Sequence, residues 1–301
     1  MSRPELSIVI LNYNTRDLTL DCLASLRKVK NESDFEIILC DNGSSDGSVE
    51  AIKEKYPEVI IIENNANLGF AKGNNAAKNI AKGEYILFLN TDTIVYKDTI
   101  RKTLDYLKEH KDVGAVTCKL VLNDGSLDKD ARRSFPTPWV SFTHLALPLD
   151  RLFPKSKLFA RYWYGYISPD TTHDADVLQG AYFLAPKKLL DEVGWFDEDY
   201  FLDGEDIDLC WKIKEKGYRL VYYPEVSILH LKGATKGKTK KVQRSKISLK
   251  DKMKFRMSGV NSMEIFYRKR MWKHYPMTVN ILVIIGIKTI KLLRIIKLIL
   301  Q

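Results

Sequence analysis

The stretch YILFLNTDT at residues 85–93 decides the expected fold, because a run of apolar residues ends there directly in polar ones. Similar apolar runs occur earlier in the chain, at residues 6–11, 35–40 and 59–62. Segments with a helical spacing of apolar residues separate them, at 15–28, 46–55 and 70–81. Strands that alternate with helices are typical of βαβ units. The sequence therefore predicts an α/β fold with a mostly parallel, Rossmann-like sheet flanked by helices.

The pattern then becomes less regular before it recovers. Residues 134–170 contain five prolines and many aromatic residues, which predicts a long loop with short helices, serving as a lid or an acceptor-binding region. Regular patterns return after it, in the order strand 175–185, helix 186–193, helix 205–216, strand 218–222 and strand 226–230.

Charge is divided unevenly along the chain. The formal net charge is +10, yet residues 231–301 contain 19 Lys and Arg against two acids, Asp251 and Glu264. The first 230 residues consequently carry a net charge of −7. An acidic body with a basic tail favours a catalytic or binding domain over 1–230 that is fitted with an electrostatic anchor over 231–301.

The end of the tail is apolar but interrupted by charge. Residues 279–300 are rich in Ile and Leu, and four basic residues break the run, namely Lys288, Lys291, Arg294 and Lys297. A membrane-spanning helix needs about 20 predominantly apolar residues in succession. We therefore expect an amphipathic helix that lies in an anionic membrane interface, on the inner face of the cell membrane. Packing of this helix on the body or in a homo-oligomer is the alternative.

Several classes of cofactor and compartment are disfavoured. The four cysteines are far apart and lack the paired spacing of a metal site, so we interpret them as buried thiols in a reducing, cytoplasmic compartment. The N-terminus has no signal-peptide pattern. The fingerprint G-x-G-x-x-G is absent after the first strand, which weakens a nicotinamide or flavin interpretation.

Polar residues follow each of the first four predicted strands. They are Asn12 after the first, Asp41 after the second, Asn67 and Gly69 after the third, and Asn90 and Asp92 after the fourth. Parallel α/β sheets bind ligands at the carboxyl ends of their strands. These loops therefore predict a site for a polar, nucleotide-like ligand. Asp46, in contrast, is interpreted as a helix cap, since Asp is common in turns and caps.

At this point the chain resembles the family 2 glycosyltransferases, and within them the rhamnosyltransferase-like branch. The resemblance covers residues 6–230 and depends on six motifs in order, SIVILNYNT (7–15), DNGSSDGS (41–48), NLGFAKGNN (67–75), LFLNTDT (87–93), QGAYFLAP (179–186) and GWFDEDYFLDGEDIDLCWK (194–212). The resemblance implies the GT-A fold, which is a nucleotide-binding α/β sheet.

The resemblance also implies a donor site. Asp41 would accept a hydrogen bond from the pyrimidine base, and the loop around Asn67 and Gly69 would close over the nucleoside. Asn90-Thr91-Asp92 stands where the family has a metal-binding D-x-D triad, and Asn90 replaces the first acid. Asp92 is then the sole carboxylate of the triad that can bind Mg²⁺ or Mn²⁺. Waters and donor phosphates would complete the coordination shell of the ion. His230 would be a further ligand of the metal.

Glu205 and Asp206 match the family's acidic pair. A sugar hydroxyl is a poor nucleophile at neutral pH, so a carboxylate must take its proton, and Asp206 is our candidate for this base. The acids could also simply complement a helix N-terminus. Arg132 and Arg133 could reach the diphosphate, and residues 179–181 would line the acceptor or sugar pocket.

The combined expectation is an inverting glycosyltransferase. It would move a sugar, with rhamnose as the candidate, from a dTDP- or UDP-linked donor to a polysaccharide or lipid-linked acceptor. Two alternatives are a nucleic-acid-binding protein that uses the basic tail and a non-catalytic scaffold of a polysaccharide assembly complex. An acidic crevice disfavours nucleic acid as the partner, and the set Asp41, Asp92 and Asp206 disfavours the scaffold.

Overall fold

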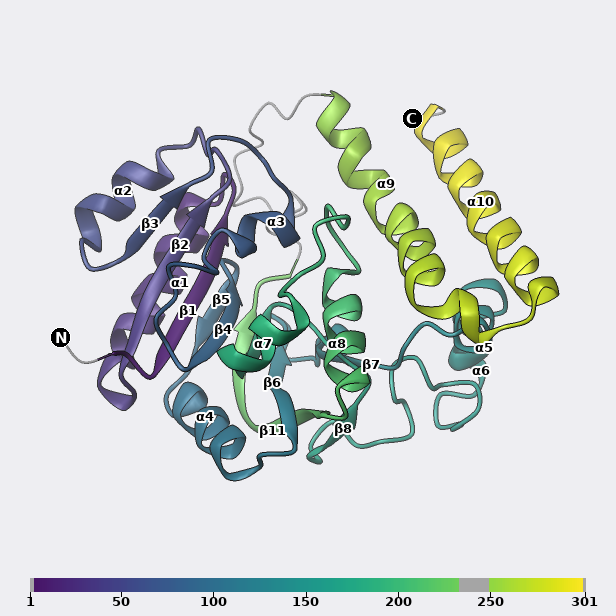
Figure 1. Cartoon of the computed structure of the whole chain (residues 1–301), viewed down its shortest axis with the longest axis horizontal. Helices are drawn as coiled ribbons and strands as arrows, with labels where there is room; N and C mark the ends of the chain where they lie inside the picture. Colours follow the sequence, from purple (N-terminus) through teal and green to yellow (C-terminus); the bar gives the residue numbers. More distant parts are fainter. Residues whose placement is uncertain (1–2, 233–248, 300–301) are drawn as a thin grey trace.

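The computed structural model describes residues 3–232 and 249–299, and its centre is a nine-stranded sheet (Figure 1). The parallel half has the order β3-β2-β1-β4. Its strands are β1 (Leu6–Asn12), β2 (Phe35–Asp41), β3 (Ile60–Glu63) and β4 (Tyr85–Asn90). β1, β2 and β4 are almost wholly buried, as expected of strands that helices cover on both faces. The predicted α/β sheet flanked by helices is thereby confirmed.

The second half of the sheet is mixed. β10 (Tyr182–Pro186) runs antiparallel to β4, and the order continues through β6 (Val113–Val121), β11 (Arg219–His230) and β5 (Thr93–Val95), while β8 (His173–Ala175) pairs with β11. The sequence predicts two strands at 218–222 and 226–230, and this is wrong, because β11 is one strand. Its pairing with β6 shifts register between Tyr223 and Ser227, so an irregularity replaces the predicted break.

Helices cover both faces of the sheet. On one face lie α1 (Arg16–Lys28), α2 (Ser48–Lys55) and α4 (Thr99–Glu109), and on the other lie α3 (Phe70–Asn75), α7 (Lys187–Val193) and α8 (Glu205–Glu215). The helix predicted over 70–81 is too long, since α3 ends at Asn75. The side chain of Asn75 bonds to both the backbone oxygen and the backbone nitrogen of Phe196, and tight turns follow it.

A small second sheet and an irregular segment lie beside this core. β7 (Arg132–Arg133) pairs with β9 (Val177–Leu178), and the chain between β7 and β8 contains only short helices. These are α5 (Pro138–Ser141), the π-helix Phe142–Ala146 and α6 (Leu149–Leu152). The predicted long loop with short helices is therefore present as expected.

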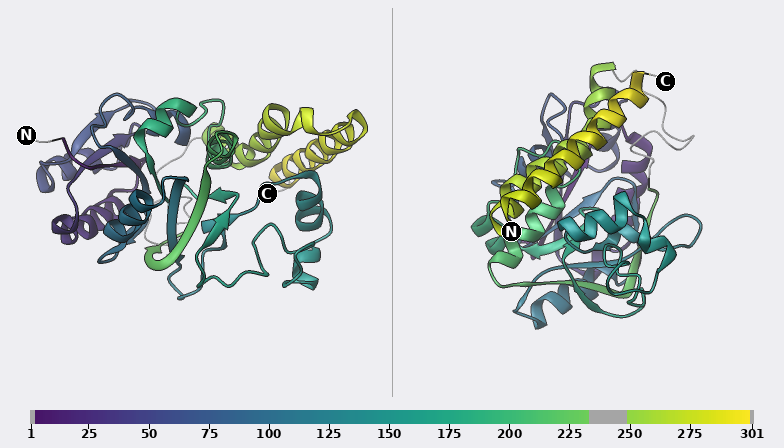
Figure 2. Two further views of the ribbon diagram at one scale, coloured as in Figure 1. Left: turned by 60° about the horizontal axis from the view of Figure 1, so that its bottom comes forward. Right: turned by 90° about the vertical axis from the view of Figure 1, so that its right-hand side faces the viewer.

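The C-terminal region forms two helices, α9 (Leu249–Phe266) and α10 (Met277–Ile299), that lie side by side (Figures 1 and 2). They share an apolar cluster with Tyr200 of the body, to which α10 contributes Ile287. Arg270, between the helices, bonds Asp208 of α8 through two nitrogens at 2.7 and 3.0 Å. The region is thus packed on the body, while the Lys-rich residues 233–248 lie outside the described residues. None of the described helices has the length and apolarity needed to cross a membrane.

Candidate active site

The carboxyl ends of β1 and β2 meet, and their polar side chains bond to one another. Asn12 donates a hydrogen bond of 2.7 Å to Oδ1 of Asp41, and the backbone and hydroxyl of Ser44 also donate to this carboxylate. Asp41 is only 2% exposed. Its carboxylate is therefore fixed in orientation by its own loop, and Oδ2 keeps a lone pair for a further donor.

The loop after β3 is tied to this cluster through Asn42. The side chain of Asn42 donates to the carbonyl of Gly69 and accepts from Asn64, and Asn67 accepts from the backbone nitrogen of Gly69. The predicted donor residues Asn12, Asp41, Asn67 and Gly69 thus belong to one hydrogen-bonded unit. Asp46 has the structural role that was predicted, because it accepts from the backbone nitrogens of Arg16 and Ser48, the first residues of α1 and α2.

Gly69 also joins this unit to the loop that precedes α8. Its φ is +83°, and a Cβ built on it would lie 2.3 Å from the carbonyl oxygen of Phe201. The next residue, Phe70, donates its backbone N–H to the same oxygen at 2.7 Å. The absence of a side chain at Gly69 therefore lets the two loops touch.

We expect Gly69→Ala to separate these loops. The variant combines a strained φ with a backbone clash, so the free energy of unfolding should fall by about 1–3 kcal/mol. Chemical denaturation measures this change. Gly194→Ala is a matched control, because Gly194 also has a positive φ but a Cβ there would meet nothing within 4 Å. Equal losses from the two variants would show that the loop contact contributes nothing.

A second group of polar residues lies at the end of β4 and the end of β11. Nε2 of His230 is 3.4 Å from Oδ1 of Asp92, and this oxygen is buried without a hydrogen-bond partner. On its other side the imidazole bonds Asp128, with Nδ1 at 2.8 Å from Oδ2. Asp92, Asp128 and His230 are each at most 3% exposed. The structure thus brings the predicted pair Asp92 and His230 together, whereas Asn90 ends β4, and within the described residues its side chain has no hydrogen bond to either.

Asp128 is a residue that sequence reasoning missed. It is 102 positions from His230, within a turn-like run of Asp and Lys that resembles any solvated loop. Burial by itself would raise the pKa of Asp128, but hydrogen bonds from His230 and Lys232 outweigh it and lower the pKa to about 2. Burial likewise opposes charge on His230, yet the hydrogen bond to Asp128 and the nearby carboxylate of Asp92 raise its pKa to about 9. Asp128 is therefore an ionised carboxylate that orients the imidazole.

The three acids at the start of α8 have different surroundings. Asp208 is fully buried and bonded to Arg270 and Tyr200, so its role is to attach the C-terminal region. Glu205 is buried with Oε2 unpartnered, and burial together with the nearby Asp206 raises its pKa well above the usual range. Burial also raises the pKa of Asp206, although the attraction of Arg133 opposes this rise. Asp206 is the one of the three that combines a raised pKa with an ionic partner.

The two arginines of β7 are both committed to protein groups. Arg133 places Nη2 at 2.5 Å from Oδ2 of Asp206. Arg132 is 2% exposed and donates to the backbone carbonyls of Trp163 and Ile167. That they reach the diphosphate stays a prediction, since the structure shows only their protein partners. Arg132 supports the irregular segment, and Arg133 positions the acid at the start of α8.

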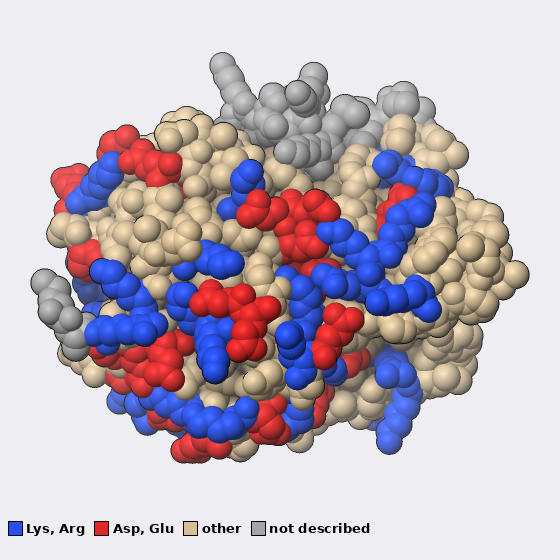
Figure 3. Space-filling model, in the orientation of Figure 1, with Lys and Arg blue, Asp and Glu red and all other residues tan. Residues whose placement is uncertain are grey.

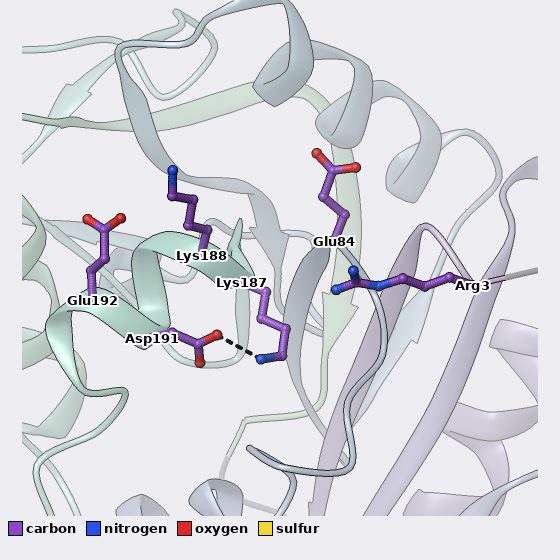
Figure 4. A pocket seen from close by; sticks show the side chains of 6 residues that line it. All are labelled: Arg3, Glu84, Lys187, Lys188, Asp191 and Glu192. Atoms are coloured by element: carbon purple, nitrogen blue, oxygen red, sulfur yellow. Dashed lines mark hydrogen bonds and ion pairs between the residues drawn. The ribbon is translucent and has the colours of Figure 1, made fainter.

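A hollow of the described surface lies elsewhere. It has a volume of about 610 Å³ and is lined by Arg3, Glu84, Lys187, Lys188, Asp191 and Glu192 (Figure 4). Arg3 and Glu84 precede β1 and β4, so the hollow lies at the amino ends of the parallel strands. Ligands of such sheets bind at the opposite edge, where Asp41 and Asp92 lie. Charges of both signs line it, and Lys187 pairs with Asp191, as in an ordinary charged surface.

Comparison with known families agrees with this geometry. A family model described as glycosyl transferase family 2 matches residues 7–194, which is more than half of the chain. The chain belongs to this family. The resemblance inferred from the motifs is confirmed, and the protein is a glycosyltransferase.

Relatives of this family 2 glycosyltransferase include two rhamnosyltransferases. The N-acetylglucosaminyl-diphospho-decaprenol L-rhamnosyltransferase of Mycobacterium tuberculosis is 26% identical over 246 residues, which are 77% of this chain and 78% of that protein. Rhamnosyltransferase WbbL of Escherichia coli K12 is 26% identical over 231 residues, covering 74% and 82% respectively. This similarity places the chain in the rhamnosyltransferase-like branch.

Solved structures show the same fold. The mannosyltransferase PcManGT of Pyrobaculum calidifontis, solved with GDP-Man and Mn²⁺, has a TM-score of 0.55 at 19% identity and covers 89% of this chain and 66% of its own. TarS 1–349 of S. aureus has a TM-score of 0.53 at 17% identity, covering 88% and 73%. At such identities the likeness concerns the fold alone.

Proposed function

We propose that this glycosyltransferase inverts the anomeric carbon of its donor sugar and that Asp206 is the general base. The observation that carries the proposal is the placement of Asp206 at the N-terminus of α8, buried and fixed by Arg133 at 2.5 Å. A raised pKa makes a carboxylate a stronger base, and the attraction of Arg133 favours its ionised form. Glu205 is the second candidate acid, but its pKa is raised further and it has no cation bonded to it in the described structure.

The proposed reaction is a single displacement. The acceptor hydroxyl oxygen forms a bond to the anomeric carbon while Asp206 takes its proton. The bond between that carbon and the donor phosphate oxygen breaks, and the nucleoside diphosphate leaves with the electron pair. Asp41 and Asn12 would recognise the base of the nucleotide, and the loop with Asn67 and Gly69 would cover the nucleoside.

A divalent cation fits the pair Asp92 and His230. The unpartnered carboxylate oxygen and the imidazole nitrogen lie 3.4 Å apart, and oxygen and nitrogen are ligands that Mg²⁺ or Mn²⁺ accepts. When bound, such an ion supplies counter-charge for the departing diphosphate. The described residues contain no group of three metal-ligating acids, cysteines or histidines. Donor phosphates and waters would therefore complete the coordination shell of the cation, and Asn90 would lie at the edge of that shell.

We expect Asp128→Asn to weaken the binding of Mn²⁺ by about 10–100-fold. A metal ion binds the neutral imidazole, in which Nδ1–H donates to Asp128 and Nε2 carries the lone pair; the amide can still contact the ring but no longer offers a carboxylate to hold that tautomer. Calorimetric titration of the protein with Mn²⁺ measures the change without any turnover.

Asp130→Asn is the matched control, because Asp130 bonds Lys232 but not His230. A loss of Mn²⁺ affinity of the same size in both variants would assign the effect to Lys232 and would remove the orienting role from Asp128.

For the substrates we propose a dTDP- or UDP-linked sugar, rhamnose first, and a saccharide acceptor that is part of a polysaccharide or is carried on a lipid. The names of the two rhamnosyltransferase relatives support this choice. The test is to incubate the purified protein with a panel of nucleotide-sugars, with and without Mn²⁺, and to measure hydrolysis. Hydrolysis of none of them would overturn the catalytic proposal in favour of the scaffold.

We also propose that residues 231–301 bind an anionic membrane surface and place the protein peripherally on the inner face of the membrane. The support is the basic charge of this region together with the apolar side of α10. A homo-oligomer formed through α10 is the alternative. Binding of nucleic acid finds no support in the family to which the chain belongs.

A further inference from the structure

Exposed large apolar side chains are concentrated in two segments of the protein. Among the described residues, 15 of the 17 such side chains belong either to residues 138–158 or to α10. In the first segment Leu152 is 71% exposed and Phe153 is 52% exposed, and in α10 Leu282 is 68% exposed and Leu293 is 60% exposed. Patches of this kind mark an interaction site, whereas scattered apolar residues do not.

The two segments are far apart in sequence but lie at the same end of the molecule. In the right-hand view of Figure 2, α10 and the short helices α5 and α6 both face the viewer. Phe135, just before the first segment, stacks on Phe266 of α9 with centroids 6.2 Å apart. We call residues 138–158 together with the outer side of α10 the apolar end. Figure 3 shows this margin as mostly uncharged surface with scattered basic side chains.

The helix α10 is oriented in an unusual way for a surface helix. One side packs into the protein through Ile287 and Asn280. Two of its basic side chains turn toward α9, where Lys288 bonds Glu264 at 2.7 Å and Lys291 bonds Asn261 at 2.9 Å. The side left outward is formed mostly by Leu and Ile, with Thr278 and Thr289 among them. A surface helix normally shows the opposite arrangement, with polar residues outward.

The charges around the apolar end are of one sign. Residues 277–299 contain no acid. Residues 138–158 contain one, Asp150, and it is bonded to His144 at 2.7 Å. Three exposed basic residues accompany it, namely Arg151, Lys155 and Lys157. The partner of this surface must therefore tolerate both apolar groups and cations.

We propose that the apolar end as a whole rests on an anionic bilayer, so that residues 138–158 form a second membrane contact beside α10. Leu and Phe side chains enter the interface, the cations meet lipid phosphates, and Trp139, 46% exposed, lies at headgroup level. The proposal extends the tail contact proposed above and does not depend on the sugar chemistry.

A second copy of this chain fits the same surface less well. A twofold interface brings the same patch of both copies together, so the basic residues of one copy would face those of the other. The described part of this surface offers no unpaired acid to neutralise them. Anionic lipid headgroups supply that negative charge.

The test is flotation of full-length protein with vesicles of 30% anionic and 70% neutral lipid. We expect these vesicles to bind the protein at low salt and to release it at high salt.

Two pairs of substitutions test the two segments of the apolar end. Leu152→Glu with Phe153→Glu should lower partitioning by at least about tenfold, and so should Leu282→Glu with Ile285→Glu. The matched control is Ile80→Glu with Tyr96→Glu, the two remaining exposed large apolar residues, which should stay within about twofold of the parent protein. These variants should keep the parent's melting temperature, since the altered side chains are exposed.

Three outcomes would overturn the proposal. Full-length protein that does not float removes the membrane contact altogether. Normal flotation of the variant at 152 and 153 removes the second contact and leaves α10 alone. A dimer that both apolar-end variants dissociate, without vesicle binding, assigns the surface to a second copy.

Fluorescence quenching provides an independent measurement on unmodified protein. Lipids brominated in the acyl chain should quench tryptophan fluorescence, and Trp139→Phe should remove most of that quenching. Flotation requires no donor, so its failure is distinguishable from failure of the proposed transfer reaction.

Discussion

Asp206→Asn should lower sugar transfer by about 10²–10⁴-fold. The amide has nearly the size of the carboxylate, and its one oxygen can still accept one of the two hydrogen bonds that Ile207 and Arg133 donate to Asp206, but it cannot take a proton. Donor binding should be retained, because the residues proposed to contact the nucleotide lie at the ends of β1, β2 and β3. The measurements are the turnover rate with the best nucleotide-sugar of the panel and the dissociation constant of that donor.

Asp199→Asn provides a matched control for this change. It replaces an acid by its amide in the same region, and Asp199 is an exposed partner of Lys269 with a side chain 67% exposed. Such surface pairs contribute about 0–1 kcal/mol to stability, so turnover should be unaffected. Near-normal turnover of Asp206→Asn would show that the base is another residue. A large loss in Glu205→Gln would then assign the role to Glu205.

Removal of divalent metal should abolish transfer, and Mg²⁺ or Mn²⁺ should restore it. The leaving diphosphate develops negative charge, and counter-charge of this kind contributes several kcal/mol to stabilising the transition state, which is about two or more orders of magnitude in rate. Asp92→Ala should weaken donor binding when metal is present, because Asp92 offers the only carboxylate of the predicted triad. Its buried oxygen without a hydrogen-bond partner is the structural basis for this expectation.

The fold itself should not require the metal. The melting temperature in EDTA should equal that in buffer, since the described residues contain no cage of protein ligands for an ion. In EDTA, donor binding by Asp92→Ala and by the unmodified protein should be alike. Full activity of the unmodified protein in EDTA would contradict the metal proposal and would point to Lys or Arg as the clamp of the diphosphate.

Much of the fold was predictable because it depends on local patterns. Apolar runs at β1, β2 and β4 indicate strands covered on both faces, and the polar residues that follow them indicate one functional edge. The errors arise where a distant contact overrides the local pattern. Asn75 ends α3 through a hydrogen bond to Phe196, which is 121 residues away. The strand β11 is continuous because it pairs with β6 on both sides of an irregularity, at which the local sequence pattern predicts a break between two strands.

The family, the α/β sheet and the types of residue available for chemistry follow from order and spacing along the chain. Which side chains meet depends on the folded arrangement. It pairs Arg133 with Asp206 and orients His230 through Asp128, contacts that join residues 73 and 102 positions apart. It also gives Asp208 a structural role and directs Lys288 and Lys291 of α10 toward α9. The physical reason is that burial and charge pairing set the pKa and orientation of a side chain, and both depend on neighbours that the fold brings together.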